Sequence, residues 1–122
     1  MNESVVNHLR DKVASLDIEP VVVGGLPALN TNCVALKPND GYESSRYFGM
    51  VASDEPLVEV VIRNESYPVG QAQYLAISKA LDMYRNPDES IMSCFLIGSP
   101  GYLGADTAGF HEWHLILHLT VL

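Results

Sequence analysis

The chain has 122 residues and a mass of 13.4 kDa, enough for one domain, residues 1–122, with its own hydrophobic core. Hydrophobic residues make up 48% of the chain, and there is no compositional bias of the kind that marks disordered, collagen-like, coiled-coil or disulfide-rich proteins. The charged fraction of 18% is below the usual value of about 25%, which indicates that a partner covers part of the surface.

The chain is acidic, with 15 Asp and Glu against 7 Lys and Arg and a formal net charge of -8. Tight binding to a phosphate backbone depends on clustered basic residues, so the charge argues against a nucleic-acid ligand. The longest segments without charge, residues 21–36 and 90–105, are too short and too rich in Gly and Pro to cross a membrane. The first residues contain no apolar signal segment, so we expect the chain to be made in a cytoplasm and to stay there.

The amino-terminal part predicts one helix followed by two strands. Apolar residues recur at helical spacing between residues 3 and 16, and Pro20 ends that pattern. A β-branched segment at 21–25 and an apolar segment at 32–37 predict two strands, and the second is expected to stop at the turn 38–41. Cys33 in this segment and Cys94 further on are predicted to be buried free thiols.

The carboxy-terminal part predicts a strand, a helix and two further strands. Residues 57–63 alternate between two faces, residues 66–84 carry apolar stripes at helical spacing, and residues 91–97 form a buried-looking strand. The segment 98–109 is rich in glycine and predicts a loop, after which residues 113–122 alternate as a long final strand. The predicted fold class is therefore α+β, with a largely antiparallel sheet of four to five strands and two helices packed on one face.

No motif for catalysis or cofactor binding is found. His114 and His118 share a face of the final strand but lie about 13 Å apart at about 3.3 Å per residue, too far for one zinc ion, and His111 points to the opposite face. The glycines of 98–109 match no phosphate-binding motif. A nucleophile arrangement of Cys94, His114 and Asp106 can be drawn, but no sequence pattern supports it. We therefore expect no metal and no cofactor.

The connection between residues 38 and 56 is the strongest candidate for a binding element. Compact domains rarely contain a connection of this length unless it binds a partner or is disordered. Residues of the kinds enriched at interfaces occur in it: Tyr42, Arg46, Tyr47, Phe48 and Met50. The alternative is that residues 46–52 form an extra hairpin whose aromatic side chains return to the protein's own core.

Three segments resemble the phage minor capsid proteins that are related to tail terminators. They are residues 33–42 (CVALKPNDGY), residues 56–63 (PLVEVVIR) with the helix around Ala72 and Leu81, and the Gly104–Asp106 turn with the final strand. The similarity covers most of the chain from about residue 30 onward. Relatives often have a second glycine where Asp40 stands and a basic residue where Ala105 stands.

The resemblance implies an α+β subunit that forms a ring with itself, usually a hexamer, at the head-proximal end of the phage tail. There it would end growth of the tail tube protein and present a surface to the connector or head-completion protein, while DNA passes through the lumen without specific binding. Ile116 and Leu122, on the second face of the final strand, are a candidate contact between subunits. Two alternatives remain: a neck or head-completion protein at the portal side, and a small cytoplasmic enzyme with a Cys/His site.

Overall fold

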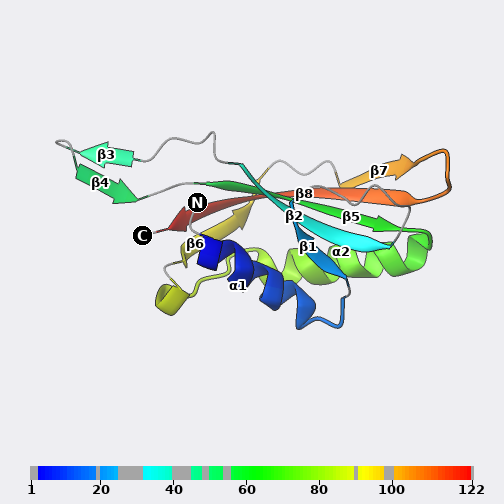
Figure 1. The fold of residues 1–122 in the computed structure, drawn as a ribbon, viewed down its shortest axis with the longest axis horizontal. Helices are drawn as coiled ribbons and strands as arrows, with labels where there is room; N and C mark the ends of the chain where they lie inside the picture. Colours follow the sequence, from blue (N-terminus) through cyan, green and yellow to red (C-terminus); the bar gives the residue numbers. More distant parts are fainter. Residues whose placement is uncertain are drawn as a thin grey trace.

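A computed structural model describes residues 3–18, 20–24, 32–39, 45–47, 50–53, 56–89, 91–97 and 101–121. The main element is a six-stranded sheet with two helices on one of its faces (Figure 1). The strand order is β1-β2-β5-β8-β6, and β7 pairs with β8 beside β6. The bounds of these strands are β1 Val21–Val23, β2 Cys33–Asn39, β5 Leu57–Asn64, β6 Ile91–Leu96, β7 Gly101–Ala105 and β8 His111–Val121.

The sheet is mixed but mostly antiparallel. Only β1 and β2 run parallel, whereas β2–β5, β5–β8, β6–β8 and β7–β8 are antiparallel. The predicted α+β class, the largely antiparallel sheet and the placement of both helices on one face are confirmed, and the sheet has one strand more than the four to five predicted.

Both predicted helices are present. Helix α1 (Glu3–Ala14) buries Val5, Leu9 and Val13, which recur at helical spacing. Helix α2 (Tyr67–Leu81) begins after Ser66, whose hydroxyl accepts a hydrogen bond of 3.4 Å from the amide of Val69. A short 3-10 helix, η1 (Pro87–Glu89), leads from α2 toward β6.

Two predictions at the level of elements are wrong. Residues 101–105 form strand β7, although their two glycines and lack of β-branched residues predict a loop; pairing with the first half of β8 supplies the stability that propensity does not. Strand β2 continues through Pro38 to Asn39. Since β1 pairs only with Val34 to Leu36, Pro38 lies where β2 is an edge strand, and an edge tolerates the missing amide hydrogen.

The core lies between the sheet and the helices. Neighbouring positions on β5 and β8 that face the helices are paired in register, as in Ile62 with Trp113 and Val60 with Leu115. These side chains are fully buried, together with Ile77 of α2. Alternation along β8 places His114, Ile116 and His118 on the opposite face, as predicted for a strand.

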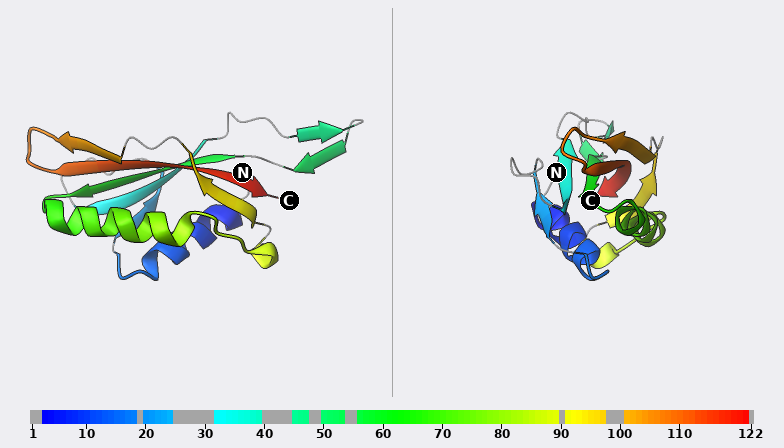
Figure 2. Two further views of the ribbon diagram at one scale, coloured as in Figure 1. Left: turned by 180° about the vertical axis from the view of Figure 1, so that it is seen from behind. Right: turned by 90° about the vertical axis from the view of Figure 1, so that its right-hand side faces the viewer.

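The segment between β2 and β5 contains a separate two-stranded hairpin, formed by β3 (Ser45–Tyr47) and β4 (Met50–Ser53). The hairpin lies beyond one end of the main sheet, whereas β7 and the start of α2 lie at the other end of the long axis (Figures 1 and 2). The molecule therefore has two structurally different ends.

Candidate assembly surfaces

The hairpin is the first candidate surface, because it contains most of the residues that the sequence singles out. Arg46 and Tyr47 lie on β3, and Met50 lies on β4; Tyr42 and Phe48 are outside the described residues. In the described part of the chain, β3 and β4 pair only with each other. Strands β3 and β4 form a hairpin, as the second interpretation of residues 46–52 predicted. The role of this segment in binding a partner stays a prediction.

An apolar patch at the opposite end of the molecule is the second candidate surface. We call it the end patch and define it by four side chains that are large, apolar or aromatic, and partly exposed: Tyr67 (42%), Val69 (49%), Tyr102 (41%) and Leu103 (54%). Tyr67 and Val69 belong to the first turn of α2, and Tyr102 and Leu103 belong to β7. The rings of Tyr67 and Tyr102 are in contact, and Val69 and Leu103 follow them two positions and one position further along the chain. Exposed apolar residues that lie close together commonly mark an interaction surface.

The end patch is built on a closely packed aromatic cluster. The rings of Tyr67 and Tyr102 meet edge to face with centroids 5.1 Å apart, and both pack against the buried ring of Trp113 at 5.5 and 5.3 Å. The hydroxyl of Tyr102 lies 2.7 Å from Nδ1 of His111. These contacts hold the two exposed tyrosines in fixed positions before any partner arrives.

Gly70 and Gln71 attach α2 to Trp113. Gly70 is buried against the indole, and a Cβ at this position would overlap Cζ3 and Cη2 of Trp113. The indole Nε1 of Trp113 donates a hydrogen bond of 2.8 Å to Oε1 of Gln71. The close approach of helix and sheet therefore depends on the absence of a side chain at position 70.

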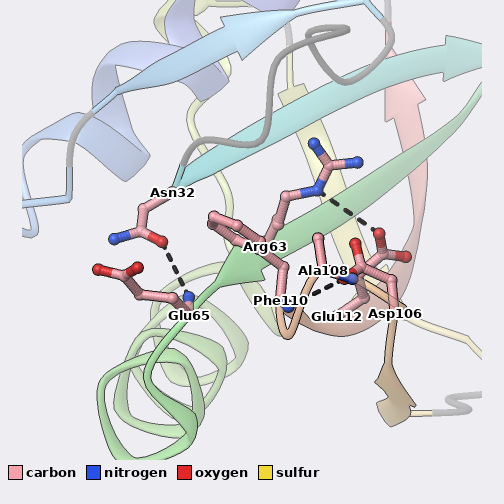
Figure 3. A network of polar contacts seen from close by, with 7 residues as sticks. All are labelled: Asn32, Arg63, Glu65, Asp106, Ala108, Phe110 and Glu112. Atoms are coloured by element: carbon pink, nitrogen blue, oxygen red, sulfur yellow. Dashed lines mark hydrogen bonds and ion pairs between the residues drawn. The ribbon is translucent and has the colours of Figure 1, made fainter.

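A set of polar contacts braces the same end of the molecule (Figure 3). In the β7–β8 turn, Oδ1 of Asp106 accepts hydrogen bonds of 2.9 Å from the amides of Ala108 and Phe110. Arg63 on β5 and Glu112 on β8 form an ion pair of 3.5 Å. The first contacts close the turn on itself, and the ion pair joins β5 to β8.

The approach to α2 is braced in the same way. The side chain of Asn32 accepts a hydrogen bond of 2.8 Å from the amide of Glu65, and the buried Asn64 accepts one of 2.9 Å from the amide of Ser66. These bonds fix the chain just before the first turn of the helix, where two residues of the end patch lie.

A groove continues from the end patch along the helices. It has a volume of about 500 Å³ and lies between the first half of α2 and the residues that follow α1. Its lining is mainly apolar: Leu16, Asp17, Ile18, Pro68, Val69, Ala72, Gln73 and Ala76. Val69 belongs to both the groove and the end patch, so the two meet at the first turn of α2.

The sheet face opposite the helices has a different character. Glu59 on β5 contacts Nζ of Lys37 at 3.8 Å and Nε2 of His114 at 3.1 Å. Ile116, a predicted contact between subunits, is half-buried on this face beside Glu59 in the β5–β8 register, and Leu122 is outside the described residues. A contact through Ile116 would therefore include this charged group.

The histidines of β8 do not converge. The strand places His111 on the helix side, next to Tyr67 and Trp113, and His114 on the other face beside Glu59. Within the described residues, no group of three or more His, Cys, Asp or Glu side chains has the arrangement of a metal site.

The two cysteines are buried free thiols, as predicted. Burial, with a smaller contribution from the charge of Asp82, raises the pKa of Cys94 to about 12. A nucleophilic cysteine needs the thiolate form near neutral pH, which its surroundings supply by lowering the pKa. The environment of Cys94 acts in the opposite direction and argues against the Cys/His enzyme alternative.

The helices of the described residues are too short to cross a membrane. The longer of the two, α2, has 15 residues, whereas a membrane-spanning helix needs about 20.

The end patch could not be predicted from the sequence. Its members come from two segments that are more than 30 positions apart, and β7 is predicted to be a loop, so nothing in the sequence brings them together. One signal was available: Tyr102 and Leu103 lie in residues 90–105, one of the two longest uncharged stretches of an acidic chain.

The protein is a small α+β subunit that has the β3–β4 hairpin at one end and the end patch at the other. A family model described as "Bacteriophage tail terminator protein" matches residues 7–121. The chain therefore belongs to the bacteriophage tail terminator family, a class of phage tail structural proteins, and the resemblance seen in the sequence is confirmed.

A solved structure supports the same fold. A chain from the virion of a native gene transfer agent particle matches with a TM-score of 0.59 and 19% sequence identity, over 89% of this chain and 83% of that chain. No curated protein sequence matches the chain.

Proposed function

We propose that this protein caps the tail tube of a phage particle as a homo-oligomeric ring. In this role a single domain, residues 1–122, ends tube polymerisation and provides the surface that joins the tail to the head. The match of residues 7–121 to the tail terminator family carries the proposal. The virion origin of the similar gene transfer agent chain agrees with it.

The two ends of the subunit fit a ring. Head-to-tail contacts use two different surfaces of one chain, and they give a closed ring when the rotation between neighbours closes. The hairpin and the end patch are two such surfaces at opposite ends of the long axis. Six copies, the number that the family resemblance implies, complete the proposed ring.

The proposed partners follow from this position. The ring contacts the tail tube protein on one side and the connector or head-completion protein on the other, at the head-proximal end of the tail, after assembly in the host cytoplasm. The net charge of -8 on each subunit is multiplied around the ring. A negative lumen repels phosphates, so that DNA passes without binding.

Controlled polymerisation of the tube protein tests the proposal. Purified tube protein is polymerised with increasing amounts of this protein, and tube lengths are measured by electron microscopy. We expect shorter tubes of narrower length distribution, with this protein at one end of each tube. Tubes of unchanged length, together with binding to the portal side of purified heads, would support the neck alternative instead.

A further inference from the structure

We propose that the β3–β4 hairpin of one subunit docks on the end patch of a neighbouring copy. This inference rests on the proposed ring and names the two surfaces that would join its subunits. It assigns a partner to the hairpin, which the sequence identifies only as a candidate binding element, and to the end patch, which the sequence does not predict.

The hairpin needs a partner. A two-stranded hairpin by itself is at best marginally stable in water, and β3 and β4 pair with no strand of the main sheet within the described ranges. The hairpin lies beyond the end of that sheet, away from the helices that cover the core (Figures 1 and 2). A surface on another molecule can supply the missing contacts.

The end patch can receive a hairpin. Its tyrosines are held by the Trp113 cluster, and the adjoining turn and helix start are braced by hydrogen bonds, so little order has to be gained on binding. Strand β7 has no charged residue and no proline, and in the described part of the chain it pairs only with β8. An unprotected edge of this kind favours pairing with a strand from another chain.

The distribution of charged residues favours a second copy of this chain as the partner that binds the end patch. Two subunits of net charge -8 repel each other, so a contact is favoured where acidic groups are absent or are met by a basic group. The four side chains of the end patch are uncharged, and the exposed acids Glu65 and Asp106 flank it in the chain. Arg46 is the only charged residue between positions 45 and 53. The hairpin therefore offers a positive charge to the acidic rim of the end patch.

The positions of the hairpin and the end patch also favour a contact between two copies. Hairpin and end patch lie at opposite ends of the long axis, so one copy cannot satisfy both surfaces by itself. When the hairpin of each copy docks on the end patch of the next, an open row of subunits has one free hairpin at one end and one free end patch at the other. Closure of the ring removes both free surfaces.

Cross-linking between two differently labelled chains tests the contact. One chain carries Ser45→Cys in the hairpin, and the other carries Ala105→Cys at the exposed end of β7; the native Cys33 and Cys94 are buried. The two chains are mixed at high concentration, alone and on tail tubes, and treated with a short bismaleimide. We expect a 1:1 cross-linked dimer from the mixture, and much less product from either chain alone.

The controls separate specific docking from chance collision. Met83→Cys, at a 75% exposed position after α2, replaces Ala105→Cys in a second mixture and should give at most one tenth of the product. Adding Val69→Ser and Leu103→Ser to the Ala105→Cys chain should reduce the cross-link at least tenfold, and circular dichroism verifies that this chain is folded. Equal cross-linking in the Met83→Cys and Ala105→Cys mixtures, or no cross-linking in any mixture, would overturn the inference.

The cross-linking experiment and the tube-length experiment can fail independently of each other. If this protein ends tube growth but the hairpin and β7 never cross-link, the ring uses other surfaces and only the present inference is wrong. If the cross-link forms but tubes grow to unchanged length, the contact is real and the tube-capping function is wrong.

Discussion

At the scale of single residues, Gly70 decides how closely α2 approaches the sheet. In the interior of a helix, alanine is normally more favourable than glycine by about 1 kcal/mol. At position 70 the added methyl group would overlap the ring of the fully buried Trp113, so packing outweighs helix propensity. The indole also supports both tyrosines of the end patch, which links this glycine to the candidate binding surface.

The first prediction is that Gly70→Ala destabilises the protein by about 1 to 3 kcal/mol, the usual cost of overpacking a core. Chemical denaturation with Trp113 fluorescence measures the change. Ala72→Gly, at an exposed position of the same helix, is the matched control and should cost only about 1 kcal/mol. A Gly70→Ala protein more stable than wild type would show that α2 and Trp113 are not in close contact.

The second prediction concerns Cys94. Since its pKa is raised to about 12, the thiol stays protonated in the folded protein at pH 8, and we expect a thiol reagent to modify it only on the timescale of unfolding. The folded state holds this proton more tightly than the unfolded state does. The contribution of Cys94 to stability is therefore constant below about pH 9 and is lost as the pH rises toward 12.

Mass spectrometry of the native protein after alkylation at pH 8 measures this reactivity, with the unfolded protein as the control. Modification of Cys94 in the native protein at the rate of a free thiol would contradict its burial and would reopen the enzyme alternative.

At the scale of elements, the hairpin is the part whose role matters most. The third prediction is that Tyr47→Ser with Phe48→Ser abolishes assembly and changes the melting temperature of the isolated subunit by no more than about 3 °C, because surface substitutions usually change stability by about 0.5 kcal/mol. Sedimentation and thermal unfolding measure the two effects. Unfolding of the double variant would mean that these aromatic rings belong to the subunit's own core.

The elements themselves could largely be predicted from the sequence, since both helices and five strands of the main sheet have regular apolar patterns. Strand β7 could not, because its glycines predict a turn and its stability comes from pairing with β8. Pro38 has a similar explanation: whether a proline ends a strand depends on its neighbours in the sheet.

The candidate surfaces were predictable only in part. The candidate binding residues of the connection 38–56 all lie between positions 42 and 50, so composition alone points to them. The end patch joins the first turn of α2 to β7 through Trp113, and such a contact exists only once the sheet has formed. Local sequence patterns contain no information about which distant segments will meet.

At the scale of the whole molecule, the acidic charge and the two different ends have to be considered together. Mutual repulsion of subunits with charge -8 is screened by salt. The fourth prediction is therefore that self-association becomes stronger between low and moderate ionic strength, which sedimentation measures. Association that weakens steadily as salt is added would mean that ion pairs, rather than apolar contacts at the end patch, dominate the interface.

The central claim is that the protein forms a ring at the end of the tail tube. Negative-stain electron microscopy of the purified protein, first alone and then with its tube protein, tests the claim most directly. We predict closed rings in at least the second sample, located at one end of each tube and with a central opening. A compact monomer in both samples, even at high concentration, would contradict the account.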